Sequence, residues 1–202
     1  MPALCRSQGT TLILKMLAPW VAVILFWCVF KNAWLALLAY HLQIVLWNHL
    51  HFRQVFFGFS VKSFVLFSLP AILAGPAMYF LLPAITEINV AQWLADYGLT
   101  GWGLLLMVPY FGLIHPLLEQ VHWAPLREKT PLAHVVFAGY HVLVLSTLLP
   151  ISWLVIGFVF LAFVSVCWQR MADSRGGLAI PCCSHMLADS GIVMAAYGLS
   201  CL

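Results

Sequence analysis

Residues 151–168 read ISWLVIGFVFLAFVSVCW, a stretch of 18 residues without one charged side chain. About 20 apolar residues in an α-helix cross the hydrocarbon core of a bilayer, so this stretch predicts a transmembrane helix. Inside lipid, every backbone N–H and C=O must be bonded within the protein, which leaves helices and closed barrels. The apolar runs of this chain are long and continuous rather than short and alternating, and they therefore favour helices.

The composition of the whole chain agrees with this stretch. Hydrophobic residues make up 64% of the 202 residues and charged residues only 7%, against roughly 45–50% and about 25% in soluble domains. So few charged side chains cannot cover a surface in water, and we expect membrane lipid to surround most of the protein. The net charge of +3 is small and scattered, which argues against a nucleic-acid partner.

The sequence predicts an all-α transmembrane bundle with about seven spans, folded as one domain over residues 1–202. The predicted spans are 10–30, 33–50, 63–85, 101–122, 132–149, 151–168 and 177–199. Segment 86–100 carries acidic and aromatic residues and is expected to lie at the membrane interface as a loop or short helix.

The distribution of basic residues predicts an orientation. Loops on the cytoplasmic side of a membrane are enriched in Lys and Arg. With the N-terminus inside, Lys31 alone falls in an outer loop. The inner loops then contain Arg6, Arg53, Lys62, Arg127, Lys129, Arg170 and Arg175. We therefore expect a multi-pass protein with its N-terminus inside and its C-terminus outside, in a bacterial inner membrane.

Three of the predicted spans contain ionisable side chains, each of which costs about 2.5–3.5 kcal/mol to insert into lipid and is a candidate for function. The groups concerned are His115, Glu119, His122, His141, His185 and Asp189. The first three share one helical stripe, and the last two are one turn apart. A rise of 1.5 Å per residue places His141 and His185 roughly 12–14 Å deep, with Glu119 shallower on the same side. We expect Glu119, His141 and His185 to face one another across a hydrated pocket.

Activation of water is the chemistry that suits this group. A glutamate held in a dry pocket can take a proton from water, while neighbouring histidines orient that water, stabilise an oxyanion or hold a metal such as zinc. Pro116 and Pro181 precede Glu119 and His185 and predict helix kinks that open a cavity. The other four histidines are assigned no role beyond interhelical hydrogen bonds; they are His41, His49, His51 and His134.

Residues 101–199 resemble the CPBP family of intramembrane proteases, which includes the type II CAAX prenyl endopeptidases and bacteriocin-processing relatives. That family has the motifs Glu-Glu-x-x-x-Arg, Phe-x-x-x-His and His-x-x-x-Asn/Asp in this order. The second motif is complete at Phe137 and His141, and the third at His185 and Asp189. In the first motif, Glu119 is followed by Gln120.

The same first motif has Ala124 where the family has arginine. Arg127 would take the place of that arginine only if the helix end bends back. The run Gly176-Gly177-Leu-Ala-Ile-Pro181 resembles the family's approach to its last motif, and Pro116-Leu-Leu-Glu119 and Trp123 fit the surroundings of its first.

The resemblance implies an endopeptidase that cleaves a membrane-anchored or C-terminally tagged protein near the cytoplasmic face. It implies Glu119 as the water-activating base, His141 and His185 as its partners, and Asp189 near the oxyanion. Gln120, His122 and Phe137 are supporting residues. The zinc alternative would use His141, His185 and Glu119 as ligands.

Two further functions remain open from the sequence. The substitutions in the first motif are compatible with a relative of altered or lost activity that binds membrane proteins as partners. Two imidazoles at similar depth, His141 and His185, are also compatible with axial ligation of a haem iron or another metal.

Overall fold

The computed structural model describes residues 2–48 and 52–201, and side chains from residue 9 onward. The described chain is all-helical, with 85% helix and no strand within those ranges. His49 and His51, to which the sequence assigned no role, lie outside the described residues, as does the side chain of Arg6.

Although seven crossings are not established, the described helices include one in each region where a span was predicted. They are α1 (Pro2–Ala22), η1 (Val23–Val29), α2 (Ala33–Asn48), η2 (Phe52–Phe56), α3 (Val61–Ser63), η3 (Phe64–Ser68), η4 (Leu69–Leu73), α4 (Ala74–Ile85), α5 (Val90–Asp96), α6 (Gly101–Pro109), η5 (Tyr110–Ile114), α7 (His115–Arg127), α8 (Leu132–Leu145), α9 (Ile151–Arg175) and α10 (Ala179–Ser200). Three of the segments, η1, η3 and η5, are π-helical turns within longer helices.

Within the described residues, five helical segments are long and apolar enough to cross a membrane. They are Gly9–Val29, Val61–Ile85, Gly101–Arg127, Ile151–Arg175 and Ala179–Ser200. The second and fifth predicted spans correspond to α2 and α8, which are apolar but have only 16 and 14 residues. The C-terminal ends of two predicted spans differ from the structure. Helices α7 and α9 continue to Arg127 and Arg175, whereas the predicted spans end at residues 122 and 168.

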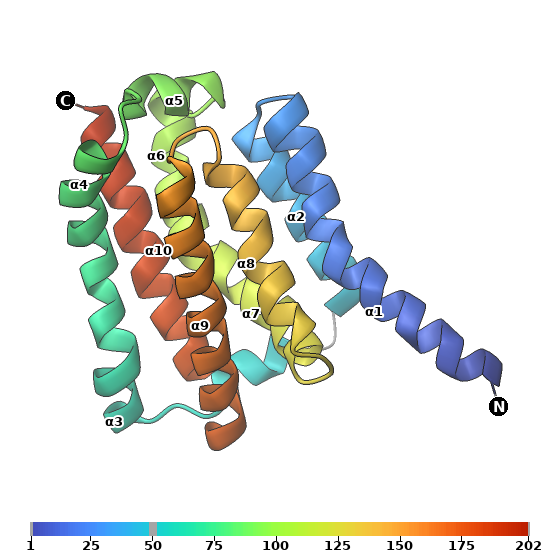
Figure 1. The fold of residues 1–202 in the computed structure, drawn as a ribbon. Helices are drawn as coiled ribbons and strands as arrows, with labels where there is room; N and C mark the ends of the chain where they lie inside the picture. Colours follow the sequence, from blue (N-terminus) through green and yellow to red (C-terminus); the bar gives the residue numbers. More distant parts are fainter. Residues whose placement is uncertain (1, 49–51, 202) are drawn as a thin grey trace.

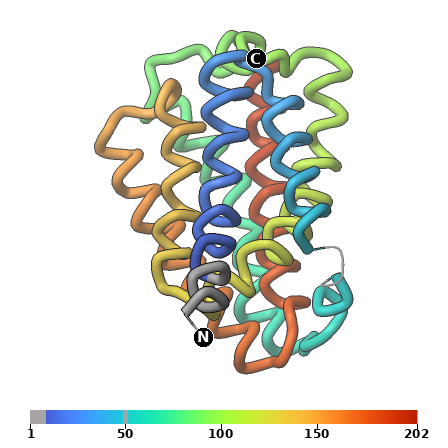
Figure 2. Tube along the Cα trace, turned by 90° about the vertical axis from the view of Figure 1, so that its right-hand side faces the viewer, coloured from blue at the N-terminus to red at the C-terminus, as the bar shows by residue number. Residues whose placement is uncertain are grey.

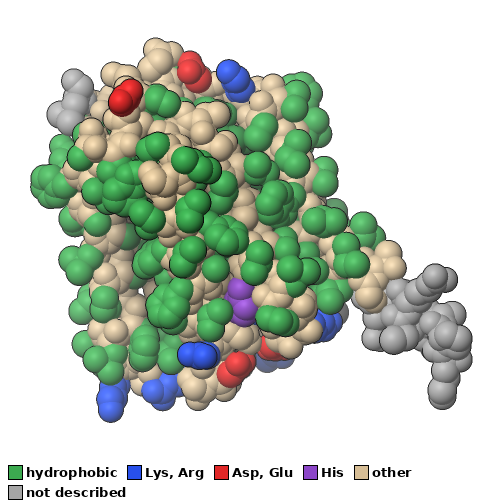
Figure 3. Space-filling view, viewed as in Figure 1, with side chains coloured by type: hydrophobic (Ala, Val, Ile, Leu, Met, Phe, Trp, Pro, Cys, Tyr) green, Lys and Arg blue, Asp and Glu red, His purple; other side chains and the backbone are tan. Residues whose placement is uncertain are grey.

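The surface of the bundle has the pattern of a protein surrounded by lipid. Large apolar side chains such as Leu46, Phe160 and Phe163 are more than half exposed on its sides. In the face shown in Figure 3, charged side chains lie at the two ends and green apolar side chains occupy the band between them. We conclude that the fold is an all-α bundle of membrane type.

The helices run side by side along the long axis of the bundle (Figures 1 and 2), with α10 packed against α4, α9 and the α6–α7 segment. Helices α4 and α10 approach each other closely. A Cβ atom added to Gly75 would lie 2.8 Å from the Cα of Gly191, so only glycine fits at this crossing. In membranes, small residues of this kind let two helix backbones come into direct contact.

The expected kink before Glu119 takes the form of the π-helical turn η5. Pro116 has no N–H to donate to the carbonyl of Gly112, four residues earlier. The hydroxyl of Ser190 on α10 donates to that carbonyl instead, at 3.2 Å. The proline therefore fixes α7 against α10 at the level of the candidate site.

The predicted kink at Pro181 is wrong. Helix α10 begins at Ala179, so Pro181 lies in its first turn, where backbone N–H groups have no partner within the helix. This proline marks the start of the helix that carries His185.

Candidate active site

The three principal candidates lie at similar depth from one end of the bundle. Glu119 is eight residues from the end of α7 at Arg127, His141 nine residues from the start of α8, and His185 six residues from the start of α10. These ends meet at the lower side of Figure 1. At 1.5 Å per residue, the three residues lie about 9–14 Å from that end.

One oxygen of the Glu119 carboxylate is held firmly. Glu119 is completely buried. Its Oε1 accepts a hydrogen bond from the Tyr40 hydroxyl at 2.9 Å and a second from the Tyr140 hydroxyl. The indole N–H of Trp123 donates to the Tyr40 oxygen at 2.7 Å, which orients that hydroxyl towards the carboxylate. These contacts fix the carboxylate in one orientation.

The other oxygen of Glu119 faces two imidazoles. Oε2 is 3.6 Å from His115 Nε2 and 3.7 Å from His185 Nε2, and it has no hydrogen-bond partner among the described residues. A buried carboxylate oxygen without a partner is costly, so the position calls for a functional explanation. Polar groups separated by more than 3.5 Å can be bridged by a water molecule.

Gln120 and Arg127 determine which nitrogen of His185 carries its proton. Arg127 Nη2 donates to Gln120 Oε1 at 2.8 Å, so the amide nitrogen of Gln120 points the other way, to His185 Nδ1 at 3.3 Å. An amide nitrogen can only donate. Nδ1 therefore accepts, and we assign the proton of a neutral His185 to Nε2, towards Glu119 and Asp189.

Asp189 lies one turn after His185 on α10. Its Oδ2 is 3.3 Å from His185 Nε2 and, like Glu119 Oε2, is buried without a hydrogen bond within the described chain. Trp168 stacks on the imidazole with ring centroids 4.4 Å apart. The imidazole of His185 is thus placed between two carboxylates, with its orientation fixed by stacking.

His115 is oriented by a second histidine. His41 Nε2 and His115 Nδ1 are 2.9 Å apart and share one proton, and His41 Nδ1 is 2.9 Å from the hydroxyl of Tyr110. When Tyr110 donates to His41, His41 donates to His115, whose own proton then lies on Nε2 and faces Glu119 Oε2. Both imidazoles next to Glu119 can therefore present an N–H to the same position.

His141 occupies a different place from the one expected. Its Nδ1 donates to the carbonyl of Phe137 at 2.9 Å, and its ring stacks on Tyr140 at 4.1 Å. In the described part of the chain, it forms no ion pair or hydrogen bond with Glu119. His141 instead lines a cavity that also reaches His115.

The predicted supporting residues surround the cluster. Gln120 touches His185 directly. His122 faces α1 and α2, where it contacts Asn48 Nδ2 at 3.1 Å and the Lys15 carbonyl at 3.0 Å. Phe137 is buried beneath the Arg127 guanidinium, which lies 5.7 Å from its ring centre.

Sequence reasoning missed several residues that the structure places at the site. They are Tyr40, His41 and Tyr140, whereas His115, Trp123 and Arg127 were named from the sequence without the contacts that they make here. The available signal was the dipeptide Tyr-His, which occurs at residues 40–41 and again at 140–141. Arg127 reaches Gln120 with its long side chain alone, since α7 remains helical to its end.

A metal centre was one of the expectations for these residues. Within residues 2–48 and 52–201, no group of three or more His, Cys, Asp or Glu side chains is arranged to hold a metal ion. In the predicted zinc set, Glu119 and His185 lie together while His141 bonds to its own helix. The zinc alternative stays a prediction.

Fold and site together define a membrane-type helical bundle with a buried acid–imidazole cluster. No family model matches the chain, and neither a curated protein nor a solved structure matches it.

Proposed function

We propose that this protein is an intramembrane endopeptidase that hydrolyses a peptide bond with water activated by Glu119. The proposal includes the similarity to the CPBP proteases, seven crossings with the N-terminus inside, and location in a bacterial inner membrane. Its substrate would be a membrane-anchored or C-terminally tagged protein, cleaved near the cytoplasmic face. The excess of basic residues in the loops at the site's end of the bundle supports this orientation.

The asymmetry of the Glu119 carboxylate supports the proposal most strongly. Two tyrosines hold Oε1, whereas Oε2 is buried, unpartnered in the described chain and close to two imidazole nitrogens. A purely structural carboxylate would have both oxygens bonded. A water molecule between Oε2 and the two Nε2 atoms would have the two to four polar partners that a buried water requires.

The reaction follows from these positions. Glu119 Oε2 takes one proton from the water, and the water oxygen forms a bond to the carbonyl carbon of the substrate. The N–H groups of His185 and His115 donate to the developing oxyanion. Glu119 then passes its proton to the leaving nitrogen as the C–N bond breaks, which yields a carboxylic acid and an amine.

Gln120 and Arg127 would preserve the function of the first family motif with different residues. In this sequence the buried guanidinium binds an amide oxygen, and the amide nitrogen orients His185. Asp189 supports His185 from the opposite side. We assign His141 a position beside the substrate, because it lines the cavity next to Tyr140.

The decisive comparison is between Glu119→Gln and Glu128→Gln in membranes of otherwise identical cells. Glu128 is exposed at the end of α7, so its variant is a matched control for the same chemical change. New protein termini would be mapped by mass spectrometry in each membrane. General acid–base catalysis contributes about 10²–10⁴-fold, so at least a hundredfold fewer cleavages are expected for Glu119→Gln alone.

Identical sets of termini in the wild type and in both variants would refute catalysis by Glu119. If membrane proteins nevertheless co-purify with the chain, the partner-binding alternative replaces the protease.

A further inference from the structure

An apolar cavity lies on the opposite side of the cluster from the basic end of the bundle. Its volume is about 230 Å³, and it is a partly open cavity lined by residues of η1, α2, α4, α5, α6, η5, α7, α8 and α10. Its walls are almost wholly hydrocarbon, including Leu37, Met107, Val144 and Ala195. The proposed reaction on a peptide bond does not by itself require a chamber of this kind.

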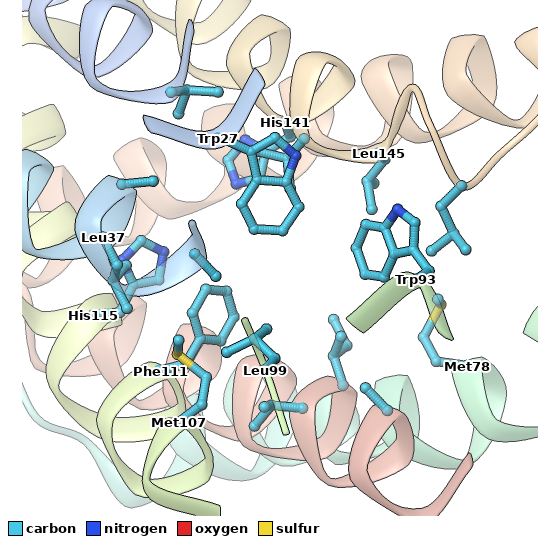
Figure 4. Close-up of a pocket in the computed structure, with 18 of the residues that line it drawn as sticks. Trp27, Leu37, Met78, Trp93, Leu99, Met107, Phe111, His115, His141 and Leu145 are labelled. Carbon is cyan, nitrogen blue, oxygen red and sulfur yellow. The ribbon is translucent and has the colours of Figure 1, made fainter. Parts of the chain in front are cut away.

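The cavity has one polar end. Where the cavity meets the cluster, it is lined by four side chains with polar atoms, which are Tyr40, His115, Tyr140 and His141. Figure 4 shows His115 on one side of the space and Trp93 and Met78 across from it, with Phe111, Leu99 and Trp27 between. The cavity thus extends from the neighbourhood of Glu119 to the interfacial helix α5, which carries Trp93.

Water would not fill the apolar part of this cavity. A buried water needs two to four polar partners. Away from the cluster the described wall is almost wholly hydrocarbon, and Trp27 Nε1, a buried donor without a partner among the described residues, is by itself too few for a water there. An unfilled void also deprives the surrounding side chains of dispersion contacts. A hydrocarbon chain satisfies both conditions, because it needs no hydrogen bonds and fills the space between the apolar walls.

The volume indicates the length of chain. An engineered apolar cavity of about 150 Å³ binds benzene, which has six carbon atoms, so 230 Å³ corresponds to about nine carbon atoms on the same scale. A single linear chain of that length can follow the cavity from α5 towards His115.

We propose that this cavity binds one linear hydrocarbon chain of about nine carbon atoms, with the polar group of the same molecule next to Glu119. The chain belongs either to a resident membrane lipid or to the substrate. The second case rests on the proposed hydrolase function, while the binding itself does not.

Binding can be measured without any enzymatic activity. The full-length protein in nanodiscs of a branched-chain phospholipid would be irradiated with decanoic acid that carries a diazirine at its far end. The label is expected on residues of the far wall, such as Met78, and an excess of unlabelled decanoate but not of butyrate should remove it.

Cavity-filling variants provide the control. Ala195 and Ala33 are buried in the wall on two different helices, so Ala195→Phe and Ala33→Phe should each reduce labelling at least fivefold. Ala77→Phe makes the same change at an exposed position of α4 and should leave labelling within twofold. Label confined to lipid-facing residues, or undiminished in both cavity variants, would overturn the proposal.

A second measurement distinguishes the two sources of the chain. Decanoyl and acetyl amides of 7-amino-4-methylcoumarin would be compared as fluorogenic substrates. If the substrate carries the chain, the coumarin should be released at least tenfold faster from the decanoyl amide than from the acetyl amide, and Ala195→Phe should abolish this difference. Equal release rates together with intact labelling would assign the site to a resident lipid. Labelling requires no turnover, so failure of labelling and failure of hydrolysis report on separate proposals.

Discussion

The two tyrosines that bind Glu119 Oε1 should differ in their contributions to stability. Replacing Tyr140 with Phe removes one hydrogen bond to a carboxylate, worth about 1.5–3 kcal/mol, and keeps the aromatic ring against Trp123 and His141. Replacing Tyr40 with Phe removes a similar bond and also takes away the acceptor of the Trp123 indole N–H. A buried donor without a partner costs a further ~1–3 kcal/mol.

The expected losses of unfolding free energy are therefore about 1.5–3 kcal/mol for Tyr140→Phe and about 2.5–6 kcal/mol for Tyr40→Phe. Titration of the purified protein in mixed micelles with sodium dodecyl sulfate, followed by far-ultraviolet circular dichroism, would measure both. Tyr197→Phe is the matched control, because this tyrosine is 38% exposed on α10. A surface substitution of this kind should stay within about 0.5 kcal/mol of the wild type.

The order of the two variants tests the hydrogen-bond network rather than general packing, since both substitutions remove only a hydroxyl. If Tyr140→Phe is as destabilising as Tyr40→Phe, the indole bond to Tyr40 contributes nothing and the orientation of the carboxylate has another origin. If neither variant differs from Tyr197→Phe, Glu119 is not bound by these hydroxyls at all.

Three other substitutions test the surroundings of the carboxylate. His41→Phe removes the partner of His115 Nδ1, so initial-rate assays should show about tenfold slower Glu119-dependent hydrolysis with a folded protein, as general acid–base partners contribute 10²–10⁴-fold at most. Gln120→Met removes the acceptor of a charged hydrogen bond together with the donor to His185, and should lower the unfolding free energy by about 2–4 kcal/mol in the same titration. Gly112→Leu should destabilise the protein by at least about 2 kcal/mol, measured as a lower midpoint of unfolding, because its Cβ would lie 2.5 Å from a side chain of α10.

The helical segments were predictable because hydrophobic length is a local property of the sequence. Residues 151–168 need no knowledge of their neighbours to be assigned to a membrane helix. The π-helical turn at residues 110–114 was not predictable in the same way. It depends on Pro116, which leaves the carbonyl of Gly112 without its helical donor. The hydroxyl of Ser190, 78 residues after Gly112 in the chain, donates to that carbonyl instead.

The depth of the site residues was predictable only in part, and their direction was not. The rise of 1.5 Å per residue places His141 as deep as expected. The expectation that Glu119 is shallower than His185 is wrong, because α7 continues to Arg127 and α10 begins only at Ala179. Neighbouring residues on a helix, however, point about 100° apart. Rotation of α8 by one position decides whether Tyr140 or His141 faces Glu119, and the packing of α8 against the rest of the bundle places the tyrosine there.

Helix α2 carries a Tyr-His pair like that of α8, and together the two helices explain why the two oxygens of the Glu119 carboxylate have different surroundings. Tyr40 and Tyr140 approach Oε1 from two helices, and each is followed by a histidine that the helical turn directs elsewhere. His41 is directed to His115, so α2 binds Oε1 through one residue and orients the imidazole beside Oε2 through the next. In the proposed reaction, Oε2 remains available for water because groups outside the reaction hold Oε1 and orient the imidazoles of His115 and His185.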